Sequence, residues 1–162
     1  MGLTGSGKTA LCKKLCNYFG YYFYDIYKRV PKRYIEKIYK NQVITDEEID
    51  EYLIDMIGDF QKKLQNGPLV VAIGPLKRKH QKMIVNSIPD SLLIMLDVSH
   101  EILGERLAKR KELNFNKDFL QTSIDTEEMF EEGNIKVYIN QPLDNVFIQI
   151  KHIISTYNKL AN

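Results

Sequence analysis

Apolar positions along the chain follow two patterns, one typical of strands and one typical of helices. Four short, nearly continuous apolar runs, at residues 21–25, 69–73, 92–97 and 135–139, have the length and composition of buried strands. Between them, apolar residues recur three and four positions apart, which predicts helices. We expect these helices at residues 8–19, 31–40, 46–64, 76–86, 99–111, 117–125 and 145–157.

Strands and helices alternate throughout, and this predicts the fold class. Alternation of this kind is typical of an α/β fold in which helices cover both faces of a parallel sheet, giving three layers. The length of 162 residues, without internal repeats or linkers, predicts a single domain over residues 1–162. Ligands of such sheets bind beyond the carboxyl ends of the strands, where Asp25, Gly74 and Asp97 fall.

A phosphate-binding motif stands at the start of the chain. Residues 2–9 read GLTGSGKT, which fits G-x-x-x-x-G-K-[ST], and a predicted helix follows at once. In such a loop, backbone N–H groups converge on phosphates, Lys8 reaches the β and γ phosphates, and the Thr9 hydroxyl is placed for Mg²⁺. A simple glycine-rich turn would not need the lysine, the threonine or the helix. The predicted nucleotide-binding residues are Gly2, Leu3, Thr4, Gly5, Ser6, Gly7, Lys8 and Thr9.

An acid and two arginines are further candidates for phosphoryl chemistry. Asp25 ends a predicted strand at the sheet edge that faces the loop, where a base is expected; an ordinary turn or cap aspartate is the alternative. Arg106 and Arg110 are four apart on a predicted helix and suit the charge of a transferring phosphoryl group. With Lys109 and Lys111 beside them, they also fit a solvated cationic helix face.

Composition narrows the class of partner. With 23 basic and 21 acidic residues the formal net charge is +2, which indicates neither a nucleic-acid-binding nor a membrane-binding protein. No apolar run approaches the roughly 18 residues of a membrane span. Cys12 and Cys16 lie on one side of the first helix and suit a reducing compartment better than a disulfide. We therefore expect a cytoplasmic protein.

Taken with the loop, three further segments make the chain resemble the gluconokinases. These segments read YYFYD, VVAIGPLKRKHQKMI and ERLAKRKELNFNKDFLQTSIDTEE. Gluconokinases are small P-loop kinases, close in fold to shikimate kinase, that phosphorylate gluconate on its 6-hydroxyl with ATP and Mg²⁺. The resemblance spans almost the whole chain. It implies substrate-side helices over about 28–65, a lid over about 106–125 and a sugar acid as the small-molecule substrate. The oligomeric state stays open, with a homodimer among the alternatives.

The resemblance also assigns roles to individual residues. The loop from Gly2 to Thr9 matches the ATP-binding motif, and Asp25 matches the acid that acts as base or orients the hydroxyl. Arg106 and Arg110 match the lid arginines of R-L-x-x-R. Lys77 matches a lysine that helps to hold a carboxylate substrate, although a solvated lysine in the run KRKH is the alternative. The implied catalytic set is Lys8, Asp25, Arg106 and Arg110, and residues 140–143 fall where this fold class holds adenine.

Several positions depart from the gluconokinase pattern, mostly on the sugar-acid side. In the gluconokinase pattern, the acid that matches Asp25 is followed by further acids and a His-Pro pair, and of these only Pro31 is present here. Residues 44–49 lack the arginine that is usual there. Gln81 replaces another arginine. An alternative therefore stays open: a nucleotide-binding relative whose acceptor activity is lost or changed, including another small-molecule or nucleoside monophosphate kinase.

The position of the loop predicts a gap in the sheet. Gluconokinases carry an apolar strand ahead of the motif, whereas here the motif begins at residue 2. We expect Met1 to be an internal methionine of a longer chain. If the 162 residues are instead taken as complete, we expect a sheet without its first strand and a core with a gap at its centre.

Overall fold

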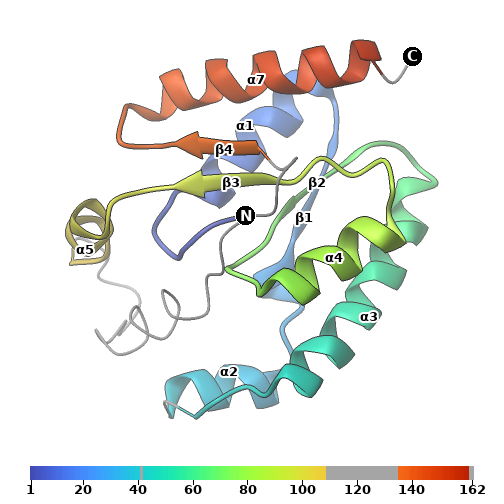
Figure 1. The fold of residues 1–162 in the computed structure, drawn as a ribbon, viewed down its shortest axis with the longest axis vertical. Coiled ribbons are helices and arrows are strands. Elements are labelled where there is room, and N and C mark those ends of the chain that lie inside the picture. Colours follow the sequence, from blue (N-terminus) through green and yellow to red (C-terminus); the bar gives the residue numbers. More distant parts are fainter. Residues whose placement is uncertain (41, 109–134, 161–162) are drawn as a thin grey trace.

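The computed structural model describes residues 1–40, 42–108 and 135–160, and strands and helices alternate along them (Figure 1). The predicted order of elements is confirmed, and the helix expected at 117–125 lies outside the described residues. The elements are α1 (Lys8–Phe19), β1 (Tyr22–Asp25), the 3₁₀ helix η1 (Ile26–Lys28), α2 (Lys32–Tyr39), α3 (Asp46–Leu64), β2 (Leu69–Ala72), α4 (Arg78–Ser87), β3 (Ile94–Asp97), α5 (His100–Ala108), β4 (Ile135–Tyr138) and α7 (Leu143–Leu160).

The strands pair in parallel, as the α/β pattern predicts. β1 pairs with β2, with Tyr22 opposite Leu69, and β3 pairs with β4, with Ile94 opposite Ile135. Among the described residues these form two separate two-stranded sheets. The expected parallel pairing of the strands is thus confirmed, within two sheets of the described residues.

Met1 pairs with β3. Its amine donates a hydrogen bond to the carbonyl oxygen of Ile94, and its own carbonyl accepts one from the Leu96 amide at 2.9 Å. In a parallel ladder, this pattern sets Met1 opposite Met95. The chain therefore reaches the phosphate loop from between the two strand pairs.

The hydrophobic core is divided in the same way as the sheet. One cluster gathers around α1, α7, β3 and β4 and includes Leu11, Leu103 and Ile150. The other gathers around α3, α4, β1 and β2 and includes Leu53 and Phe60. Figure 1 shows α1 with α7 and α3 with α4 on opposite sides of the strands, which is the arrangement expected of a three-layer fold.

The start of α3 is fixed by a capping box. The Thr45 hydroxyl accepts a hydrogen bond from the Glu48 amide, and the Glu48 carboxylate accepts one from the Thr45 amide. This exchange satisfies amides that the first turn of a helix leaves without partners. It fixes the first turn of α3, in which Asp46 lies close to Lys77 at the start of α4.

Candidate functional site

The loop between Met1 and α1 has a backbone that only glycines adopt easily. Gly5 and Gly7 have φ of +91° and +84°, in the left-handed region. Gly2 has φ of +143°, and a Cβ there would lie 2.7 Å from the carbonyl oxygen of Leu96. The glycines predicted for the phosphate loop are therefore needed for its curvature and for its close approach to β3.

The loop leads into a helix start that suits an anion. Gly7 precedes α1 without a side-chain cap, and the first turn of α1 contains no acidic residue. The helix N-terminus thus keeps its partial positive charge and its amides. The Ser6 hydroxyl is buried and has no hydrogen-bond partner within the described part of the chain. These groups fit the phosphates of a nucleotide.

The side chain of Lys8, the first residue of α1, reaches back to the loop. Its side-chain amine donates hydrogen bonds to the carbonyl oxygens of Gly2, at 2.7 Å, and Leu3, at 2.8 Å. The residue is only 5% exposed. These bonds tie the loop to the Lys8 side chain, and the role of Lys8 toward phosphate stays a prediction.

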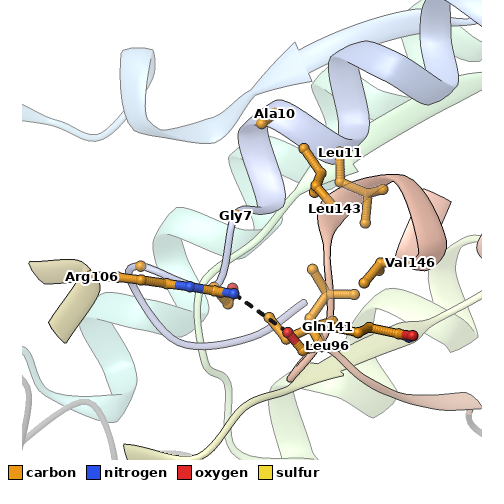
Figure 2. A pocket seen from close by; sticks show the side chains of 11 residues that line it. Gly7, Ala10, Leu11, Leu96, Arg106, Gln141, Leu143 and Val146 are labelled. Carbon is orange, nitrogen blue, oxygen red and sulfur yellow. Dashed lines mark hydrogen bonds between the residues drawn. The ribbon is translucent and has the colours of Figure 1, made fainter. Parts of the chain in front are cut away.

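A pocket of about 350 Å³ opens beside the loop (Figure 2). Leu11, Leu143 and Val146 form apolar walls, and Arg106 extends across it from α5. The Arg106 guanidinium donates a hydrogen bond to the carbonyl oxygen of Ile139 at 3.4 Å. The structure thus brings together the loop, Arg106 and the segment after β4 that contains Gln141, all of which the sequence singled out.

Asp25 lies at the carboxyl end of β1, opposite Ala72 of β2 and just before η1. On the neighbouring helix α1, burial raises the pKa of the Cys12 thiol to about 11, and the charges of the N-terminus, Cys16, Lys8 and Asp25 have smaller effects. The role of Asp25 as a base stays a prediction.

Lys77 is engaged in an ion pair. It lies just before α4, and its amine is 2.8 Å from a carboxylate oxygen of Asp46. Lys79 is also close to Asp46, at 3.3 Å, and to Asp50, at 3.2 Å. The hydrogen bond from Lys77 is the main cause that lowers the pKa of Asp46. Sequence reasoning missed these acids, although their spacing of four on a predicted helix and the run KRKH were the available signals.

His80 is the buried neighbour of this ion-pair group. It is fully buried, and its Nε2 atom is 3.1 Å from an Asp50 carboxylate oxygen without the orientation of a hydrogen bond. Burial lowers its pKa. His80 is thus a residue of the core.

The structure leaves the predictions for the lid and for Thr9 untested. Arg110 and most of the lid predicted over about 106–125 lie outside the described residues. Thr9 follows Lys8 in the first turn of α1 and is half-buried, and its role toward Mg²⁺ stays a prediction. Within the described ranges, no three or more His, Cys, Asp or Glu side chains form a metal-binding group.

Comparisons with known proteins agree with the geometry of the loop. The family model described as "AAA domain" matches residues 1–132. The chain is 28% identical over 142 residues to a probable gluconokinase of Xenopus tropicalis, covering 78% of this chain and 75% of the relative. It is 26% identical over 159 residues to the thermoresistant gluconokinase of Escherichia coli (strain K12), covering 95% of this chain and 90% of the relative.

Solved structures give the same picture of the fold. A gluconokinase from Sinorhizobium meliloti 1021 superposes with a TM-score of 0.84 at 25% identity, covering 99% of this chain and 93% of the other. The shikimate kinase of Aquifex aeolicus vf5 superposes with a TM-score of 0.65 at 18% identity, covering 100% of this chain and 97% of the other. The P-loop kinase fold is thereby confirmed, as is the resemblance to gluconokinases. None of the helices in the described ranges combines the length and apolar character needed to cross a membrane.

Proposed function

Because the chain belongs to the AAA domain family of P-loop proteins, we propose that it is an ATP-dependent kinase acting on a small hydroxylated acid. The acceptor we propose is D-gluconate, and the product is 6-phosphogluconate. The names of the relatives support this choice of acceptor. The observation that carries the proposal is the pocket that joins the glycine loop, Arg106 and the segment after β4 at one edge of the sheet.

The loop and the pocket would divide the nucleotide between them. The amides at the start of α1, the Ser6 hydroxyl and Lys8 suit the phosphates. The apolar walls made by Leu143 and Val146 suit the adenine ring. Arg106, which extends across this pocket, would contact the nucleotide there.

Magnesium would depend on few protein groups. Mg²⁺ commonly keeps several waters and binds through phosphate oxygens with one or two protein oxygens, and Thr9 would supply one of these. When bound, the ion neutralises charge on the β and γ phosphates. A hydroxyl at the helix start beside the loop fits that chemistry without a cluster of carboxylates.

Asp25 would act on the acceptor hydroxyl. The acceptor oxygen forms a bond to the γ phosphorus while the bond from that phosphorus to the bridging oxygen of ADP breaks, and Asp25 takes the hydroxyl proton. Arg106, together with Arg110 of the lid, would balance the charge on the transferring group. Closure of the lid over about 106–125 would exclude water as a competing acceptor.

Lys77 would bind the carboxylate of the acid. Asp46 has two lysine partners, Lys77 at 2.8 Å and Lys79 at 3.3 Å. Lys77 can therefore turn toward a substrate while Asp46 keeps a cationic neighbour, so the carboxylate of Asp46 is not left unpaired.

ADP formation measured across a panel of acceptors tests the proposal. The panel contains gluconate, other sugar acids, shikimate, nucleoside monophosphates and a blank without acceptor. We expect the highest acceptor-dependent rate with gluconate. A higher rate with another acceptor would overturn the assignment of gluconate while keeping the kinase.

A second function, nucleotide binding without transfer, is favoured by one observation. The Lys8 amine already bonds the carbonyl oxygens of Gly2 and Leu3, which compete with phosphate oxygens for it. Calorimetric binding of ATP combined with the blank rate for every acceptor would establish this function in place of the kinase.

A further inference from the structure

A histidine without hydrogen bonds lies in the core where α4 packs against α3. The side chain of His80 is fully buried, and neither ring nitrogen has a hydrogen-bond partner among the described residues. A buried polar group without a partner loses its hydration and gains no hydrogen bond in return. An apolar side chain would fill the same space without that cost, so packing alone does not account for a histidine at this position.

Asp50 of α3 lies beside this ring. One of its carboxylate oxygens is 3.1 Å from the Nε2 atom of His80, which is the distance of a hydrogen bond without its orientation. A protonated ring donates from both nitrogens, so a small rotation of the partly exposed Asp50 carboxylate would complete a charged hydrogen bond. The pair is therefore close to a second arrangement that requires one more proton.

Burial is the main cause that lowers the pKa of His80, so the ring is neutral at pH 7. The charges around the ring have smaller effects: the acids raise its pKa and the lysines lower it. These charges belong to Asp50 and Asp46 of α3, to Lys79 of α4 and to Lys77 just before α4. A change in this set of charges would therefore change the protonation of His80.

The four charged side chains balance one another while the ring is neutral. Lys77 pairs with Asp46 at 2.8 Å. Lys79 lies between the two acids, 3.3 Å from Asp46 and 3.2 Å from Asp50. Two ammonium groups thus meet two carboxylates, and these four side chains carry no net charge.

Binding of an acid at Lys77 would disturb this balance. The proposed function assigns Lys77 to the carboxylate of the acceptor, and the present inference rests on that function. Once Lys77 has turned to the acceptor, Asp46 and Asp50 share the ammonium group of Lys79. Two carboxylates with one cation between them raise the proton affinity of the groups nearby.

We propose that His80 takes up a proton when the acceptor carboxylate binds Lys77, and that the resulting imidazolium pairs with Asp50. Lys79 then stays with Asp46, so both acids keep a cation. The proton comes from solvent by way of the partly exposed Asp50 carboxylate and returns to solvent when the acceptor leaves. His80 is thus a positioning residue that couples acceptor binding to pH.

Calorimetry counts this proton. D-gluconate is titrated into the chain at about pH 6.5 in two buffers of different ionisation enthalpy, and the difference in heat gives the number of protons taken up. We expect uptake by the unchanged chain and by His152→Gln, which alters an exposed histidine of α7, and no uptake by His80→Gln. Gluconate binding without proton uptake, or equal uptake by His80→Gln, would overturn the proposal.

The affinity for gluconate should follow the same proton. Because the bound state holds the proton more tightly, the Kd of gluconate should fall about 3- to 10-fold as the pH is lowered by about one unit from neutrality, tenfold being the limit for one proton. This fall should be absent in His80→Gln and present in His152→Gln. A Kd that depends equally on pH in both variants would assign the effect to other groups and contradict the proposal.

A measurement without acceptor separates this inference from the proposed function and leaves the core intact. Lys77→Met removes from Asp46 the same ammonium group that the acceptor would remove. The midpoint of the His80 ring in an NMR pH titration should rise above that of the unchanged chain, whereas Lys62→Met, at an exposed position of α3, should leave it unchanged. The rise should be lost when Asp50→Asn is added, because the imidazolium then has no carboxylate partner.

The two kinds of measurement fail in different ways. A midpoint that does not rise in Lys77→Met, or a rise that Asp50→Asn leaves unchanged, would overturn the coupling of His80 to these charges. A rise of the expected kind together with no binding of gluconate would support the coupling and would remove gluconate as the acid that Lys77 binds.

Discussion

The side-chain amine of Lys8 donates a hydrogen bond to the carbonyl oxygen of Gly2, 2.7 Å away, in the same loop. Together with the bond to Leu3, this contact closes the loop on its own lysine. Phosphate oxygens carry more charge than carbonyl oxygens and form stronger hydrogen bonds with an ammonium group. We therefore expect Lys8 to change partners when a nucleotide enters.

Replacing Lys8 by alanine tests this exchange. Loss of a charge-assisted hydrogen bond costs about 1.5–3 kcal/mol, so Lys8→Ala should weaken ATP binding about 10- to 100-fold in calorimetric titration. Lys13→Ala, at an exposed position of the same helix, is the control and should bind ATP as the unchanged chain does. ATP affinity within threefold of the unchanged chain for Lys8→Ala would show that Lys8 does not reach the phosphates.

Asp25→Asn separates proton transfer from nucleotide binding. An amide cannot take the hydroxyl proton, and a positioned general base contributes about 10²- to 10⁴-fold to rate. We expect kcat to fall within that range while the Kd of ATP changes less than about twofold. Asp55→Asn, an exposed acid on α3, is the matched control and should leave both values unchanged. Undiminished turnover by Asp25→Asn would show that Asp25 does not act as the base for the acceptor hydroxyl.

Arg106→Ala tests the nucleotide pocket. Its guanidinium extends across the pocket and contacts Ile139, so its removal opens one wall. We expect ATP affinity to fall about tenfold, as for the loss of one charged contact. Glu105→Ala, at the exposed neighbouring position, should bind ATP normally. Equal affinities for the two variants would place the nucleotide away from Arg106.

Cys12 makes stability depend on alkaline pH. Burial raises its pKa from 9.0 to about 11 in the folded chain. A raised pKa means that its contribution is complete below pH 9 and is lost as pH rises toward 11. Urea titrations should show that the free energy of unfolding falls by roughly 1–3 kcal/mol between pH 8.5 and 11. This fall should be smaller in Cys12→Ala. The same loss in both chains would assign the effect to other groups.

Local signals in the sequence predicted most of the fold. The bounds of α1 and α3 match the predicted ranges of 8–19 and 46–64, because Gly20 ends the first helix and Thr45 caps the second. The strands were found from their apolar runs, each starting or ending within two residues of the observed bounds. The motif GLTGSGKT forms a loop whose glycines have positive φ.

Contacts between distant segments could not be predicted in the same way. Lys77 was expected to be available to a substrate, whereas it pairs with Asp46, which lies 31 residues away in the sequence. Arg106 was grouped with Arg110 by helical spacing, but its observed partner is Ile139 beyond β4. Periodicity specifies which side of a helix a residue occupies, and the partner across space depends on how the elements pack.

Phosphorus-31 NMR of the chain with MgATP and D-gluconate tests the central claim most directly. The account predicts a phosphate monoester signal that grows with ADP, requires gluconate and disappears with Asp25→Asn. The spectrum without gluconate should show only the slow background of hydrolysis by water. Bound ATP together with no gluconate-dependent monoester signal would contradict the assignment of this chain as a gluconate kinase.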